Sequence, residues 1–108
     1  MRDIKFRGCE WNADNELLPF VYGKLCDVDV IRTIEGVDKV VHYKTVGQFT
    51  GLFDKNGKEI YEGDVINVPY NFIGNIKVVF EKGIYNISKY NISLVEIIGN
   101  IHTTPELL

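Results

Sequence analysis

The sequence has few of the features that define secreted or membrane proteins. It contains two cysteines, Cys9 and Cys26, which are too few and too far apart to form a disulfide framework. No apolar run approaches the roughly 18 residues that a membrane-spanning helix needs. No signal peptide precedes the first strand-like segment. We therefore expect a cytoplasmic protein with free thiols and no membrane partner.

A surplus of positive charge is also missing. The 108 residues include 12 Lys and Arg against 15 Asp and Glu, which gives a formal net charge of −3. Proteins that hold duplex nucleic acid by neutralising its phosphates usually carry a clear basic surplus. The overall charge therefore disfavours nucleic-acid binding, and only a local basic patch would support it.

Motifs for catalysis and for metal binding are absent from the sequence. The potential ligands Cys9, Cys26, His42 and His102 are far apart and form neither a C-x-x-C nor an H-x-x-x-H pattern. Neither cysteine lies in a nucleophile turn, and there is no phosphate-binding loop or dinucleotide fingerprint. We predict no catalytic, cofactor-binding or metal-binding residue.

One acidic cluster allows two interpretations. Asp54, Glu59, Glu62 and Asp64 could hold a divalent metal in a nuclease-like site, which would make the chain an enzyme that binds such a metal. However, Glu62 and Asp64 flank Gly63 on a tight bend, where carboxylates normally accept backbone hydrogen bonds. We favour the turn-forming role and predict that the chain is not an enzyme.

Apolar alternation with period two is the dominant pattern, and no segment shows the 3.6-residue stripe of an amphipathic helix. Turn residues recur about every eight to twelve positions, which is typical of a small barrel or sandwich. Within residues 17–22, Pro19 cannot donate to a ladder, so we expect a short or edge strand that Gly23 ends. Residues 25–43 predict an appended arm, with Glu35-Gly36 closing a hairpin.

Residues 48–68 form the clearest local pattern, which predicts strand, turn, strand, bend and strand. Asn56-Gly57 favours a hairpin with a primed turn, because both residues tolerate positive φ. Gly63 permits the next bend, and the Asp64 carboxylate can accept nearby N–H groups. We assign structural roles to Thr50, Gly51, Asp54, Asn56, Gly57, Ile60, Tyr61, Glu62, Gly63 and Asp64.

The run T-G-L-F-D-K-N-G-K-E-I-Y-E-G-D-V at residues 50–65 resembles the central signature of the YopX family, small proteins encoded by phages and prophages. The opening M-R-D-I-K-F-R and the ending I-I-G-N-I-H-T-T-P-E-L-L are similar to the family's termini. The chain departs from the usual Ala-Trp-Asp at residues 8–11 and from Tyr-Glu-Asn at residues 102–104.

The resemblance implies a mainly β protein with an SH3-like small barrel, little helix, frequent self-association and no agreed biochemical activity. We accordingly expect one domain over residues 1–108. Residues 1–45 would form the N-terminal strands and arm, and residues 46–108 the barrel core.

Two functions remain open. The first is a phage accessory protein that acts through protein contacts, as a homo-oligomer or with a host or phage protein. Leu107 and Leu108 need a surface to cover them, either on their own domain or on a second copy, and a strand of the arm could join a partner's sheet. The second is single-strand nucleic-acid binding, with aromatic rings for stacking and lysines for phosphates. Its candidates, which could equally be core aromatics and edge-protecting lysines, are Tyr70, Phe72, Lys77, Lys82, Tyr85, Lys89 and Tyr90.

Overall fold

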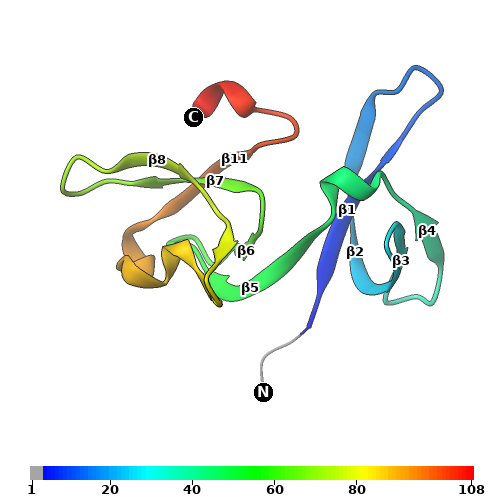
Figure 1. Ribbon diagram of the computed structural model, residues 1–108, viewed down its shortest axis with the longest axis horizontal. Coiled ribbons are helices and arrows are strands. Elements are labelled where there is room, and N and C mark those ends of the chain that lie inside the picture. Colours follow the sequence, from blue (N-terminus) through cyan, green and yellow to red (C-terminus); the bar gives the residue numbers. More distant parts are fainter. Residues whose placement is uncertain (1–3) are drawn as a thin grey trace. The chain divides into compact units, whose positions relative to one another are not determined.

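The computed structural model describes residues 4–108 and shows short antiparallel strands linked by tight turns (Figure 1). Strands account for 49% of these residues and helices for 12%, and no helix reaches seven residues. The prediction of a mainly β protein with little helix is therefore confirmed. Within the described residues, no sheet closes into a barrel. The chain divides into two compact units, Met1–Phe49 and Thr50–Leu108.

The first unit is one antiparallel sheet in the order β4-β3-β2-β1-β5. Ile31 and Val41 are fully buried in this unit, and Cys9 is nearly so. The residues of the predicted arm continue this sheet, because β3 and β4 add to β2. The elements are β1 (Phe6–Trp11), β2 (Leu17–Asp27), β3 (Val30–Arg32), β4 (Asp38–Val40), the 3-10 helix η1 (Tyr43–Thr45) and the start of β5 (Gly47–Phe53).

Strand β2 is longer than the sequence predicts. Its first half pairs with β1, where Pro19 lies beside a shift in register and its missing N–H is tolerated. Gly23 was expected to end the strand, and that prediction is wrong. The Gly23 backbone passes so close to the carbonyl of Arg32 that a Cβ would collide with it. Glycine therefore carries β2 onward as its pairing changes from β1 to β3.

The second unit surrounds a single hydrophobic cluster. A three-stranded sheet, β11-β7-β8, and a two-stranded sheet, β10-β9, lie with the β5–β6 hairpin around Ile60, Ile66, Val68, Val78, Tyr85, Ile87 and Val95. The elements are β6 (Glu59–Tyr61), β7 (Asp64–Val68), β8 (Gly74–Lys77), β9 (Phe80–Glu81), β10 (Ile84–Tyr85), η2 (Asn86–Lys89), η3 (Ile92–Leu94), β11 (Glu96–Asn100) and η4 (Pro105–Leu107).

The β5–β6 turn differs from the predicted primed turn. Gly57 has φ +80°, but Asn56 is not among the described residues with positive φ. Backbone bonds run from Gly57 N–H to the Asp54 carbonyl at 3.0 Å and from Asp54 N–H to the Lys58 carbonyl at 2.9 Å. This pattern is typical of a type I turn followed by a left-handed glycine. The Asp54 carboxylate explains it, since Oδ1 also accepts the N–H groups of Asn56 and Lys58.

Candidate functional site

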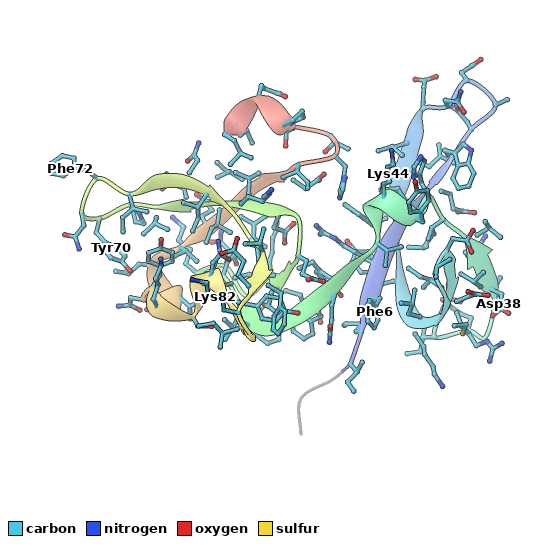
Figure 2. The ribbon with its side chains drawn as sticks, in the orientation of Figure 1. Phe6, Asp38, Lys44, Tyr70, Phe72 and Lys82 are labelled. Atoms are coloured by element: carbon cyan, nitrogen blue, oxygen red, sulfur yellow. The ribbon has the colours of Figure 1, made fainter. Side chains whose placement is uncertain are left out.

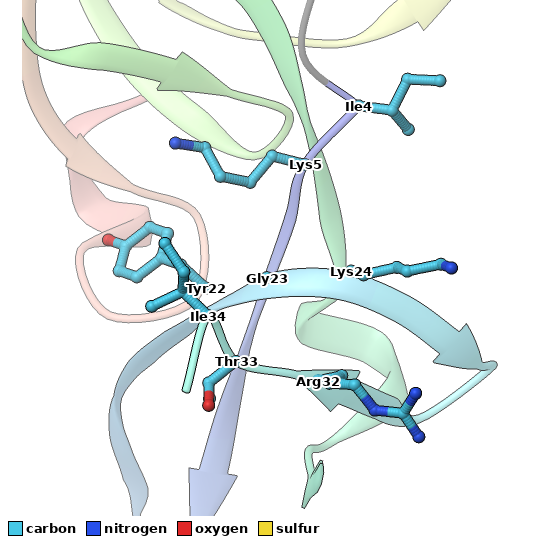
Figure 3. Close-up of a pocket in the computed structure, with 8 residues that line it drawn as sticks. All are labelled: Ile4, Lys5, Tyr22, Gly23, Lys24, Arg32, Thr33 and Ile34. Carbon is cyan, nitrogen blue, oxygen red and sulfur yellow. The ribbon is translucent and has the colours of Figure 1, made fainter. Parts of the chain in front are cut away.

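A groove opens in the first unit where the sheet divides (Figure 3). Strand β2 pairs with β1 as far as Gly23 opposite Phe6, and from Lys24 onward it pairs with β3. At the same point the backbone of Lys5 pairs with β5 instead, because the Lys5 carbonyl accepts the N–H of Phe49 at 2.7 Å. The gap between these strand pairs is a groove of about 660 Å³ lined by Ile4, Lys5, Tyr22, Gly23, Lys24, Arg32, Thr33 and Ile34.

The groove is cationic. Its lining holds Lys5, Lys24 and Arg32 and no carboxylate. Outside the lining, Asp38 holds Arg32 with both oxygens, at 2.7 Å from Nε and 3.1 Å from Nη2. This hydrogen bonding, with the attraction between the charges, raises the pKa of Arg32 and lowers the pKa of Asp38. The ammonium of Lys5 lies 5.4 Å from the centre of the Phe49 ring.

Apolar side chains accompany these cations. Ile4, Tyr22 and Ile34 line the groove and are all exposed, Ile34 almost completely at 97%. Lys24 and Arg32 are direct partners across β2 and β3, and their side chains extend in the same direction in Figure 3. The groove therefore combines an apolar wall with a basic edge. Such a combination suits a ligand that carries both apolar groups and negative charge.

The β3–β4 hairpin presents a second exposed feature, which we call the hairpin surface. It comprises four exposed apolar residues, Val28 in the preceding β2–β3 turn and Ile34, Val37 and Val40 in the hairpin, which are 73%, 97%, 49% and 56% exposed. Strand β4 ends the strand order of its sheet, so within the described residues it pairs with β3 alone. An edge strand beside branched apolar side chains is a usual place for contact with another chain.

The aromatic candidates for nucleic-acid stacking do not form one surface. Tyr85 is 6% exposed and packs edge-to-face on Phe80 at 4.9 Å, so it belongs to the core and the prediction of a stacking role for it is wrong. Tyr70 and Tyr90 also pack on the core, and the Tyr70 hydroxyl accepts the Asn91 N–H at 2.7 Å. Phe72 alone is fully exposed, at the tip of the β7–β8 loop (Figure 2).

The lysine candidates are only partly brought together. Lys82 and Lys89 line a hollow of about 210 Å³ with Glu81, Ile84 and Asn86. Lys77 lies on β8 and is not part of this lining. Lys89 lies 5.4 Å from the centre of the Tyr90 ring. Glu81, in the same lining, offsets part of the positive charge of the hollow.

Two acidic residues of the central signature, Asp54 and Asp64, stabilise turns. Asp54 is 5% exposed and its Oδ2 accepts the Ile97 N–H, while Asp64 Oδ2 accepts the Tyr61 N–H at 2.8 Å. Glu59 Oε1 accepts the Tyr61 hydroxyl at 3.0 Å. Across residues 4–108, no three His, Cys, Asp or Glu side chains are placed to hold a metal ion together.

Leu107 takes the first of the two positions predicted for the C-terminal leucines. The carbonyl of Leu107 accepts the side-chain N–H of Asn75 on β8 at 2.8 Å. A Cβ on Gly99 in β11 would lie 2.7 Å from Leu107 Cδ1, so the side chain packs against that strand. Leu108 is more exposed. The tail therefore docks on its own unit, within the part of the chain that the structure describes.

The two cysteines are not bonded to each other. Cys9 is buried, and this burial raises the pKa of its thiol despite a hydrogen bond with Thr45. Cys26 is exposed on β2. No helix among residues 4–108 has the length and apolar character to cross a membrane.

The groove residues were missed by the sequence analysis. Lys24, Arg32 and Ile34 lie on segments whose alternation of polar and apolar residues is ordinary for strands. Only the pairing of β2 with two partners in turn brings these residues together with Ile4 and Tyr22. No motif spacing could have indicated that arrangement.

These features define a small antiparallel β protein with an open cationic groove and an exposed apolar hairpin. The chain belongs to the YopX family, because the family described as YopX protein matches residues 10–108. The suspected family is thereby confirmed, although the predicted N-terminal signature at residues 1–7 precedes the matched range, and its first three residues lie outside the described structure.

A solved structure shows a similar fold. The crystal structure of protein EF1440 from Enterococcus faecalis matches with a TM-score of 0.60 and 24% sequence identity. The match covers 100% of this chain and 99% of that protein. Among curated proteins, no match is found.

Proposed function

We propose that this YopX-family chain is a non-enzymatic phage or prophage accessory protein that acts in the bacterial cytoplasm through protein contacts, beginning with a second copy of itself. The hairpin surface carries the proposal. Its four branched apolar side chains remain exposed in a chain of 108 residues whose other β-branched residues are largely used in the core.

The physical basis is the burial of apolar area. Covering such side chains is worth about 25 cal/mol per Å² removed from water. Neighbouring strand β4 adds backbone N–H and C=O groups that a partner strand could pair with. Two copies that meet at this surface would bury these apolar side chains and pair these backbone groups of their β4 strands. Both effects support self-association.

We further propose that the second unit is an opened form of an SH3-like barrel. Its short sheets, β5–β6, β11-β7-β8 and β10-β9, share one hydrophobic cluster, and 3-10 turns connect the later strands. Small barrels of this kind often use their loops and edges for binding rather than for catalysis. This interpretation agrees with a non-enzymatic role.

Sedimentation velocity over a wide range of concentrations tests the self-association. The double variant Val37→Glu/Val40→Glu places two charges on the hairpin surface without changing a residue that lines the groove. We expect the wild type to show a concentration-dependent dimer and this variant to remain a monomer. A matched control, Leu94→Glu/Leu108→Glu, adds the same charge to exposed apolar positions of the second unit and should dimerise normally. A wild type that stays monomeric throughout would overturn the self-association.

Nucleic-acid binding is the second candidate function, and the hollow with Lys82 and Lys89 is the observation that favours it. Phe80 and Ile84 are exposed on the same β9–β10 hairpin. Replacing Lys77, Lys82 and Lys89 by Glu should abolish binding of single-stranded DNA if this function is correct. Under the protein-contact proposal, the same triple variant should dimerise like the wild type.

A further inference from the structure

We propose that the groove between Ile4 and Lys5, which precede β1, and the β2–β3 pair binds an extended acidic peptide of a partner protein. This inference deepens the proposed function and rests on it, because it assigns a site and a ligand chemistry to the protein contacts. The groove is distinct from the hairpin surface in all but one residue, Ile34, which belongs to both.

Charge complementarity is the first argument. The lining of the groove holds three cations and no carboxylate, although the chain as a whole has a net charge of −3, and Asp38 outside the lining pairs with one of them, Arg32. For Lys24, no ion pair occurs among the described residues. A carboxylate beside Lys24 would meet its ammonium group and also lie near Arg32, whose side chain extends in the same direction (Figure 3). Such a ligand would gain more than the small energy of one exposed ion pair.

Arg32 is also oriented to bind a ligand carboxylate. Asp38 occupies its Nε and Nη2 atoms and fixes the plane of the guanidinium group. The Nη1 atom has no partner in the described part of the chain. An arginine held in this way donates to a ligand carboxylate with little further loss of side-chain entropy. Because Arg32 faces Lys24 directly across β2 and β3, one carboxylate could contact both side chains.

Shape is the second argument. A volume of about 660 Å³ lies within the usual range of ligand sites. Tyr22, Gly23 and Lys24 on β2 and Arg32 on β3 give the groove an extended wall. Side chains of an extended peptide alternate in direction with about 3.3 Å per residue. Acidic residues at every second position would face Lys24 and Arg32, while the apolar residues between them would cover Tyr22 and Ile34. A peptide that alternates acidic and apolar residues therefore fits the groove.

A nucleic acid fits the same groove less well. Its bases would need successive aromatic rings for stacking, and Tyr22 is the one ring in the lining. Ile4 and Ile34 offer branched apolar surface instead, which suits Leu or Val side chains. We therefore assign the groove to a peptide.

Fluorescence anisotropy with labelled peptides of about six residues, sized by the extended rise per residue, tests the assignment. One peptide alternates Asp and Leu, and its matched control alternates Asn and Leu. We expect the acidic peptide to bind the wild type roughly tenfold more tightly than the amide peptide, with an affinity that falls as salt is added. Equal affinity for the two peptides would overturn the proposal.

Two charge-reversal variants locate the site. Lys24→Glu should weaken binding of the acidic peptide by roughly tenfold or more. Lys44→Glu makes the same change of net charge at an exposed residue of the same unit outside the groove, and should change the affinity by less than about twofold. Equal losses in the two variants would place the binding elsewhere. Thermal unfolding of both variants verifies that they remain folded, and Lys24→Gln, which should give an intermediate loss, replaces Lys24→Glu if that variant unfolds.

Two further measurements distinguish failure of the peptide assignment from failure of the proposed function. If an oligo-dT strand displaces the bound peptide more strongly than unlabelled peptide does, the groove is a nucleic-acid site and the peptide assignment is wrong. Sedimentation of Lys24→Glu should show normal dimers, because Lys24 is outside the hairpin surface. A wild type that dimerises but does not bind acidic peptide would overturn this inference alone, and the proposed function would stand.

Discussion

The side chain of Asp54, in the β5–β6 turn, accepts a hydrogen bond from the backbone N–H of Ile97 on β11 at 3.0 Å. Its other oxygen accepts two N–H groups of its own turn, at 2.8 and 2.9 Å. One buried carboxylate therefore shapes a hairpin and connects it to a strand 43 residues later. This arrangement explains structurally why an aspartate stands at this position of the central signature.

Removing the charge of Asp54 should destabilise the protein. In Asp54→Asn the amide N–H₂ replaces one acceptor oxygen, so at least one buried backbone N–H loses its partner. We expect the free energy of unfolding to fall by about 2 kcal/mol, the usual cost of an unsatisfied buried donor. Urea denaturation measures the change. Glu106→Gln, an exposed position in η4 of the same unit, should have almost no effect.

The same carboxylate predicts how stability depends on pH. Burial alone would raise the pKa of Asp54, but the hydrogen bonds from Ile97, Lys58 and Asn56 outweigh it and hold the pKa below its ordinary value of 3.8. The unfolded state therefore binds the proton more tightly than the folded state does. The stabilisation is complete above about pH 5, and it disappears as the pH falls through the folded pKa.

The difference between wild type and Asp54→Asn isolates this effect. Their gap in unfolding free energy should be constant from about pH 7 to about pH 5 and should shrink steadily below about pH 4. Urea titrations at a series of pH values provide the data. A gap that does not change down to about pH 2.5 would show that Asp54 titrates normally.

Two turn glycines should respond differently to the same substitution. Gly63 and Gly57 both have positive φ, +89° and +80°. A Cβ on Gly63 would lie 3.3 Å from His102 Nε2, whereas a Cβ on Gly57 would meet nothing within 4 Å. The Gly63 backbone is also bonded on both sides, to Val78 and Ile101. It therefore cannot shift easily to relieve strain.

We expect Gly57→Val to cost about 1–2 kcal/mol, from backbone strain alone. Gly63→Val should cost clearly more, enough to unfold or aggregate the protein near room temperature, because packing adds to strain. Thermal unfolding followed by circular dichroism compares the two variants. Equal melting temperatures for the two variants, or no change at Gly63, would contradict this account of the bend.

The docking of the tail depends on Gly99. A Cβ at this position would collide with Thr104 Oγ1 and lie 2.7 Å from Leu107 Cδ1. Gly99→Ala should therefore release η4 from β11 and lower stability by about 1–3 kcal/mol. Hydrogen exchange at the Leu107 and Leu108 amides, which bond to Thr104 and Pro105 at 3.2 and 3.3 Å, should become faster. Unchanged exchange would show that the tail does not need this contact.

Local chemistry predicted the parts of the fold that depend on neighbouring residues. The left-handed glycine at residue 57 and the tight bend around residue 63 are encoded within a few positions. Burial of Tyr85 could not be predicted, because an alternating strand pattern does not say which face a small hairpin turns inward. The passage of β2 through Gly23, and with it the groove, depends on pairing between distant segments. The local sequence does not indicate which distant segments pair with each other.

The protein-contact function is tested most directly by a tagged pull-down from infected or lysogenic host cells, split into nuclease-treated and untreated halves. The wild type and the Val37→Glu/Val40→Glu variant are compared in parallel. We predict that the wild type retains its protein partners after nuclease treatment, untagged copies of itself among them, and that the variant loses those untagged copies. Recovery of nucleic acid, with every protein lost on nuclease treatment, would contradict the account and direct attention to Lys82 and Lys89.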